Sequence, residues 1–119
     1  MPAPSVTILH NPRCSKSRAA LQAAEAAGVD VDVVRYLEHP LDEAGLRQLI
    51  AKLEDPPQAL VRRGDAKAAG IAPEAYADVD GVVAVLTAHP ELMERPVLVR
   101  GDAAVIGRPT ERAEALLRP

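Results

Sequence analysis

The fold is decided by the stretch Val6-Thr7-Ile8-Leu9-His10-Asn11-Pro12-Arg13-Cys14-Ser15-Lys16-Ser17-Arg18. Val6 to Leu9 is a short β-rich run, and it stops at the polar turn that spans residues 10–15. The alanine-rich composition from Lys16 to Ala27 favours a helix, which Gly28 then ends. The sequence therefore predicts a strand, a loop and a helix, with a cysteine in the loop.

A second strand is predicted from Val31 to Tyr36, and it completes a βαβ unit with the elements before it. The right-handed crossover of such units implies that the two strands pair in parallel. The intervening helix is expected to face the sheet through three small or apolar side chains, Leu21, Ala24 and Ala27.

Helices are predicted for the middle of the chain. Apolar residues recur at helical spacing from Asp42 to Leu53, namely Leu46, Leu49, Ile50 and Leu53. The segment from Asp55 to Asp78 contains several prolines and glycines, and short helical turns such as Gln58 to Val61 are expected there. A further helix is predicted from Val79 to Ala88, with Asp78 as its N-cap.

The C-terminal part predicts a hairpin followed by a helix. Val97 to Val99 and Ala103 to Ile106 flank the turn Arg100-Gly101-Asp102, and the last helix begins near Thr110. The whole order indicates an α/β, thioredoxin-like fold. It comprises a mixed β-sheet of about four strands, a βαβ unit and then a ββα unit, with an inserted helical segment. We expect residues 1–119 to form a single domain.

Composition excludes several classes of function. The net charge of −3 and the absence of a basic stripe argue against nucleic-acid binding. No apolar stretch approaches the roughly 20 residues of a membrane span, and Met1 to Ser5 lacks the pattern of a signal peptide. The one cysteine excludes an internal disulfide, so we expect a reducing, cytoplasmic location. A monomer is the simplest expectation.

Neither a metal nor a tightly bound cofactor is predicted. The three histidines, His10, His39 and His89, are widely separated, and none is spaced with Cys14 as a ligand set. No glycine-rich nucleotide loop is present.

The residues around Cys14 favour a reactive thiolate. The cysteine lies where a strand passes into a helix, so free backbone N–H groups and the positive end of the helix dipole point at its sulfur. The Ser17 hydroxyl is placed to donate a hydrogen bond to it. His10, Arg13, Lys16 and Arg18 add positive charge. The residues expected to tune the thiolate are His10, Asn11, Ser17 and Arg18, with His10 as a tuner rather than a proton carrier. An ordinary buried cysteine is the alternative, and the polar surroundings argue against it.

An ordered set of short motifs extends this pattern along nearly the whole chain. They are residues 10–18, Tyr36-Leu37-Glu38, Ala59-Leu60-Val61-Arg62, His89-Pro90-Glu91-Leu92-Met93-Glu94-Arg95-Pro96-Val97 and Ile106-Gly107-Arg108-Pro109. In these motifs the chain resembles the glutaredoxin-linked arsenate reductases, the ArsC-like family with a thioredoxin-like fold.

The resemblance implies that three arginines bind an oxyanion beside the cysteine, and the matching residues are Arg62, Arg95 and Arg108. Guanidinium groups suit this role because their forked donors match tetrahedral oxyanions. Arg63 adjoins Arg62, so which of the two faces the site stays open. The resemblance also implies a cis bond before Pro96. The other arginines, Arg63, Arg100, Arg112 and Arg118, are expected to be solvated surface charges.

The mechanism implied by the resemblance is attack of the Cys14 thiolate on arsenate, with loss of water. Because no second cysteine can resolve the adduct, electrons come from glutathione as an external reductant together with glutaredoxin, and arsenite is released. No cofactor is bound in this scheme.

Three other functions share features with this sequence. A tyrosine phosphatase of low molecular weight needs an arginine after five further residues, where this chain has Ala20. A non-catalytic regulator of the same structural family binds a protein partner and usually carries Cys-x-x-Cys, where this chain has Ser17 in the second place. A single-cysteine, glutathione-dependent thiol oxidoreductase would use the same thiolate. The set of arginines favours arsenate reduction over these alternatives.

Overall fold

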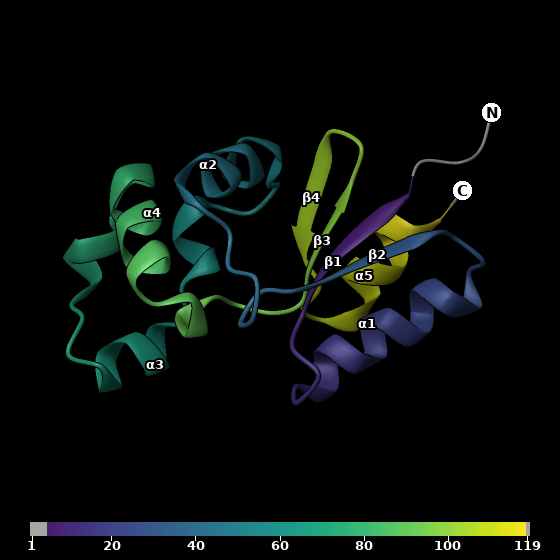
Figure 1. Ribbon diagram of the computed structural model, residues 1–119, viewed down its shortest axis with the longest axis horizontal. Coiled ribbons are helices and arrows are strands. Elements are labelled where there is room, and N and C mark those ends of the chain that lie inside the picture. The colour runs from purple at the N-terminus through teal and green to yellow at the C-terminus, as the bar shows by residue number, and fades with distance from the viewer. Residues whose placement is uncertain (1–4, 119) are drawn as a thin grey trace.

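A four-stranded mixed sheet organises the chain, and the computed structural model describes residues 5–118 (Figure 1). The strands are β1 (Val6–His10), β2 (Val31–Arg35), β3 (Val97–Arg100) and β4 (Ala103–Ile106), in the order β2-β1-β3-β4. Strand β1 runs parallel to β2 and antiparallel to β3, and β3 and β4 form an antiparallel hairpin. This topology confirms the predicted fold class, the parallel βαβ unit and the hairpin. The expectation that Met1 to Ser5 is not a signal peptide concerns five residues, of which residues 1–4 lie outside the described range.

Two helices cover one face of the sheet, α1 (Ser15–Ala26) and α5 (Thr110–Leu117). Ile8, Leu98 and Val105 point from the sheet into the core that these helices close. The buried face of α1 consists of Ser17, Ala20 and Ala24, with Leu21 packed at its margin. The prediction that Ala27 faces the sheet is wrong, because Ala27 caps the helix end and is exposed beside Gly28, whose φ of 72° turns the chain away.

The inserted segment between β2 and β3 packs against the other face and extends beyond it (Figure 1). Its helices are α2 (Glu43–Lys52), α3 (Arg63–Ala68) and α4 (Val79–Ala88), and its short 3₁₀ turns are η1 (Pro57–Leu60), η2 (Pro73–Tyr76) and η3 (Pro90–Leu92). Leu9, Val97 and Ile106 of the sheet share one core with the leucines and valines of α2 and α4.

Both long helices of the insert begin as predicted. The Asp78 carboxylate accepts a hydrogen bond from Gly81 N at 2.7 Å, and Asp42 caps α2 in the same way at 2.8 Å. Helix α3 was not predicted, because six residues are too few for an apolar period to show. Within residues 5–118, no helix combines the length and the apolar character needed to cross a bilayer.

Candidate active site

Cys14 is the N-cap residue of α1, at the junction between β1 and the helix. Its backbone N–H donates to Asn11 O at 3.0 Å, which closes a tight turn, and its own carbonyl accepts from Arg18 N at 3.0 Å. The side chain is partly exposed and makes no capping hydrogen bond. Since the first N–H groups of α1 have no partner within the helix, they point toward the sulfur.

Ser17 is fully buried beneath this turn, and its hydroxyl does not serve the sulfur directly. The Oγ atom accepts from Asn11 N at 3.0 Å and lies 2.7 Å from Nδ1 of His10. The expectation that the Ser17 hydroxyl donates to Cys14 is therefore wrong, because two nearer partners occupy it. The Ser17 hydroxyl instead ties the end of β1 to the first turn of α1.

His10 contributes no positive charge to the site. Burial, followed by the charges of Arg35 and Arg18, lowers the pKa of the imidazole below its ordinary value. At neutral pH the ring is therefore uncharged. The sequence-based expectation of a cationic His10 fails because the ring is buried and faces two arginines.

Asn11 and Arg18 brace the loop from two sides. The Asn11 Oδ1 atom accepts from Arg13 N at 3.0 Å, and Arg18 Nη1 donates to Pro12 O at 2.9 Å. Both side chains thus shape the turn that carries Cys14 and do not contact its sulfur with a hydrogen bond.

Arg108 reaches the sulfur directly, since its Nη2 lies 3.4 Å from Cys14 Sγ. Its Nε donates to the backbone oxygen of Arg95 at 2.6 Å. The two arginines come together because Gly107 N donates to Pro96 O at 2.9 Å, and a Cβ on Gly107 would lie 2.9 Å from a Leu98 methyl carbon. A side chain at position 107 would therefore require the Leu98 side chain to shift. The Arg95-Pro96 bond is cis, as expected, and the Arg108-Pro109 bond is cis as well.

The surroundings of Cys14 stabilise its thiolate. Partial burial acts to raise the pKa of the thiol. Hydrogen bonds from the Ser17 backbone N–H, the Arg95 side chain and the Lys16 backbone N–H act in the opposite direction, as does the charge of Arg108. Together they outweigh burial, and the pKa of Cys14 lies below its ordinary value.

Glu94 joins the arginines, and sequence reasoning did not single it out. Its Oε1 atom accepts from Arg95 N at 3.1 Å and lies 3.3 Å from Arg108 Nε and 3.8 Å from Arg62 Nε. The four residues Arg62, Arg95, Arg108 and Glu94 are called the arginine cluster below. One carboxylate oxygen thus holds two guanidinium groups at the edge of the site.

A short backbone pairing brings Arg62 to this cluster. Val61 and Met93 form an antiparallel bridge, Arg62 N donates to Leu92 O at 2.8 Å, and Glu94 N donates to Leu60 O. Arg62 lies within ion-pair distance of Glu94, whereas Arg63 begins α3 and makes no ion pair among the residues that the structure describes. Arg62 reaches the cluster through Glu94.

Two buried polar atoms near the cysteine have no hydrogen-bond partner among the described residues, the Tyr36 hydroxyl and Arg95 Nε. Burial raises the pKa of Tyr36, and the neighbouring Asn11 amide and Arg95 charge offset this only in part. Tyr36 was part of a motif but was not expected in the site. The signal in the sequence was that Tyr36 is one of two tyrosines in a chain that has no phenylalanine and no tryptophan.

Two arginines expected to be solvated are bound within the fold. Arg112 Nη1 pairs with the Asp55 carboxylate and donates to Ile106 O at 3.2 Å. Arg100 donates to two backbone oxygens near the C-terminus, those of Leu116 and Arg118, each at 3.0 Å. Sequence spacing could not show these partners, because both arginines bind groups that only the folded chain brings near.

The lowered pKa of Cys14 makes a prediction about its alkylation by iodoacetamide. The thiolate is the reactive form, so the rate rises with pH through the pKa of the thiol. For wild type we expect a midpoint below that of a cysteine in an unstructured peptide measured alongside it. Replacing Arg108 by alanine removes a cation and should move the midpoint to higher pH. A wild-type midpoint at or above the ordinary value would contradict a stabilised thiolate.

Comparison with known proteins places this arrangement in a family. An arsenate reductase from Neisseria meningitidis serogroup A is 38% identical over 117 residues, which cover 96% of this chain and 99% of that protein. The uncharacterized protein YfgD of Escherichia coli is 39% identical over 110 residues, covering 90% of this chain and 92% of its own. The solved structure of a putative arsenate reductase from Yersinia pestis superposes with a TM-score of 0.80 at 36% identity, covering 91% of this chain and 96% of that one. The sequence matches the ArsC family over residues 9–116, and the chain therefore belongs to the ArsC family.

Proposed function

We propose that this chain is an arsenate reductase in which the Cys14 thiolate attacks arsenate held by Arg62, Arg95 and Arg108. The observation that carries the proposal is the 3.4 Å contact between Arg108 Nη2 and Cys14 Sγ, because it puts an oxyanion-binding group beside a nucleophile. The names of the relatives in Neisseria meningitidis and Yersinia pestis support the choice of arsenate.

The first step forms a sulfur–arsenic bond and breaks an arsenic–oxygen bond. The departing oxygen takes up protons and leaves as water, so the adduct on Cys14 still contains arsenic(V). Arginines suit this step because the oxygens of arsenate carry negative charge, which fixed guanidinium donors stabilise without reorganisation. The Arg95 side chain donates a hydrogen bond to the Cys14 sulfur, and its buried Nε has no partner among the described residues.

Reduction requires two electrons, and this chain has no second cysteine to provide them. We propose glutathione and glutaredoxin as the source. The first external thiol bonds to arsenic and displaces an oxygen as water. A second thiol then attacks the sulfur of the first, and a disulfide forms while the electron pair stays on arsenic. Water finally displaces Cys14 and releases arsenite. In sum, arsenate and two thiols give arsenite, one disulfide and one water.

A coupled assay tests the proposal. Purified protein is incubated with arsenate, glutathione, glutaredoxin, glutathione reductase and NADPH, and both NADPH loss and arsenite are measured. We expect NADPH loss that depends on arsenate and matches the arsenite formed. If arsenate causes no NADPH loss, but this chain causes it with a glutathione mixed disulfide after glutaredoxin is left out, the chain is a thiol oxidoreductase. If neither substrate is consumed, the result favours the alternative function of a non-catalytic regulator that binds a protein partner.

Glu94 is expected to position the arginines during this reaction. Glu94→Ala removes the acceptor shared by Arg62, Arg95 and Arg108, and we expect kcat/KM for arsenate to fall about tenfold, the size expected for one hydrogen bond to a charged group. Glu94→Gln keeps one acceptor atom and should lose less. Unchanged kinetics in Glu94→Ala would show that the arginines are held by other contacts.

A further inference from the structure

Arg108 lies in the short connection between β4 and α5. It is the second residue after Ile106, where β4 ends, and the second before Thr110, where α5 begins. Its guanidinium contacts Cys14 Sγ and the backbone oxygen of Arg95. Because a long side chain can reach such partners only from a fixed starting point, the groups that hold the backbone of this connection also determine where the guanidinium lies.

The carboxylate of Asp55 binds residues on both sides of Arg108. Its Oδ2 atom accepts a hydrogen bond from Ile106 N at 3.1 Å, two residues before Arg108. Its Oδ1 atom pairs with Nη1 of Arg112, four residues after Arg108. The same nitrogen of Arg112 donates to Ile106 O at 3.2 Å. The Asp55–Arg112 pair therefore binds both backbone polar groups of Ile106 and connects them to the first turn of α5.

Asp55 is itself held against the edge of the sheet. Leu53, directly after α2, forms a parallel bridge with Ala104 of β4, and Glu54 N donates to Ala104 O at 2.9 Å. The side chain of Asp55 is 13% exposed. An ion pair that is partly shielded from water and accompanied by hydrogen bonds has a more definite geometry than an isolated surface pair. Asp55 thus joins the inserted segment, β4 and α5 at the base of the connection that carries Arg108.

We propose that Asp55 and Arg112 are positioning residues for Arg108, and that they keep its guanidinium beside Cys14 Sγ and the oxyanion. The inference rests on the proposed function for the oxyanion, but its effect on the thiolate needs no substrate. The partners of the Asp55 carboxylate are Ile106 and Arg112, so the pair acts on the sulfur only through Arg108. Without the pair, Arg108 keeps its charge but is placed less closely, and it stabilises negative charge less well.

Alkylation of Cys14 by iodoacetamide tests this role without arsenate. Asp55→Ala removes the acceptor of Ile106 N and the partner of Arg112. We expect the pH midpoint of alkylation to rise by about half of the shift that Arg108→Ala produces. The direction is informative, because the loss of a negative charge would by itself lower the pKa of the thiol and move the midpoint down. A midpoint that stays in place or falls in Asp55→Ala would overturn the proposal.

A second background shows whether the effect passes through Arg108. In a protein that already carries Arg108→Ala, Asp55→Ala should not raise the midpoint any further, because the group on which it acts is absent. A rise as large as in the wild-type background would overturn the proposal, since it would mean that the substitution loosens the surroundings of Cys14 in general. If Asp55→Ala does not fold, Asp55→Asn, which keeps an acceptor for Ile106 N, replaces it in both backgrounds, with a smaller rise expected in the first.

Asp78→Ala is the control for a loss of stability. Asp78 also accepts a hydrogen bond from a backbone N–H, that of Gly81, but it caps α4 in the inserted segment. Its replacement should lower the unfolding temperature by about 4 °C and leave the alkylation midpoint unchanged. If Asp78→Ala moves the midpoint as far as Asp55→Ala does, general destabilisation explains the shift and the positioning role is refuted.

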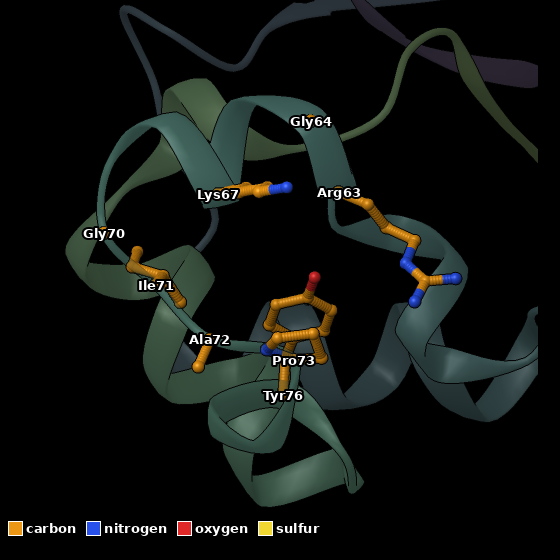
Figure 2. Close-up of a pocket in the computed structure, with 8 residues that line it drawn as sticks. All are labelled: Arg63, Gly64, Lys67, Gly70, Ile71, Ala72, Pro73 and Tyr76. Atoms are coloured by element: carbon orange, nitrogen blue, oxygen red, sulfur yellow. The ribbon is translucent and has the colours of Figure 1, made fainter.

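Arg63→Ala is the control for the partner of Asp55. Arg63 and Arg112 both lie in the first turn of a helix, α3 and α5. Arg63 lines the hollow beside α3 that Figure 2 shows, and neither Cys14 nor a residue of the arginine cluster is among the residues that line it. Arg112→Ala should raise the midpoint, whereas Arg63→Ala should leave it near the wild-type value. Equal shifts in the two variants would contradict a specific role of Arg112.

The coupled assay separates this inference from the proposed function. Asp55→Ala should lower kcat/KM for arsenate about fivefold, as expected when a donor is misplaced but not lost. If wild type does not reduce arsenate while the alkylation midpoints shift as described, the proposed function fails and the positioning role of Asp55 stands. If arsenate is reduced and Asp55→Ala changes neither the midpoint nor kcat/KM, the positioning role fails alone.

Discussion

Cys14→Ser should reduce arsenate-dependent NADPH oxidation below about one-thousandth of the wild-type rate, which is background. A serine hydroxyl is not ionised at neutral pH, whereas the pKa of the Cys14 thiol is lowered by the N–H groups of α1 and by Arg95 and Arg108. The loss should appear in kcat, because Arg108 and its neighbours remain in place to bind the oxyanion. The coupled assay measures it directly.

This substitution separates chemistry from folding unusually well. Cys14 is the N-cap of α1 and makes no side-chain capping bond, while serine is among the preferred N-cap residues. The variant should therefore be as stable as wild type, or more stable by about 1 kcal/mol at most. Thermal unfolding checks this. Residual arsenate reduction in a folded Cys14→Ser protein would show that another group is the nucleophile.

Local patterns were enough to predict the sheet, the long helices and the place of Cys14. Each of these depends on residues close together in the sequence, such as the apolar period of α2 and the aspartate that caps α4. The orientation of individual side chains could not be predicted as well from the sequence. Ser17 was expected to face the sulfur, yet in the fold its hydroxyl is taken by His10 and Asn11.

The gathering of the arginines could not be predicted from spacing alone. Arg62, Arg95 and Arg108 came from the resemblance, because they lie in separate segments of the chain. The contact that relates Arg62 to the others is a single bridge between Val61 and Met93, which no periodicity reveals. Glu94 was not predicted for the same reason. An acidic residue next to an arginine is usually a solvated surface charge, and only the fold shows that Glu94 contacts Arg62, Arg95 and Arg108.

Arg108→Lys should lower kcat/KM for arsenate about 100-fold, the size expected when one preorganised donor to an oxyanion is lost. The planar guanidinium of Arg108 serves three partners at once, with Nη2 near Cys14 Sγ and Nε toward Arg95 O and Glu94 Oε1. A lysine keeps the charge but has one nitrogen, which cannot reach all three. Because the charge remains, the alkylation midpoint of Cys14 should move less than in the alanine variant.

Arg100→Lys is the matched control for this change. Arg100 also donates to backbone oxygens, those of Leu116 and Arg118 at the end of α5, but it lies outside the arginine cluster, so its replacement should leave kcat/KM near the wild-type value. The comparison shows whether the geometry of the guanidinium or only its charge matters at position 108. If Arg108→Lys retains full activity, a cation of any shape suffices beside Cys14, and the forked donor has no special part in holding arsenate.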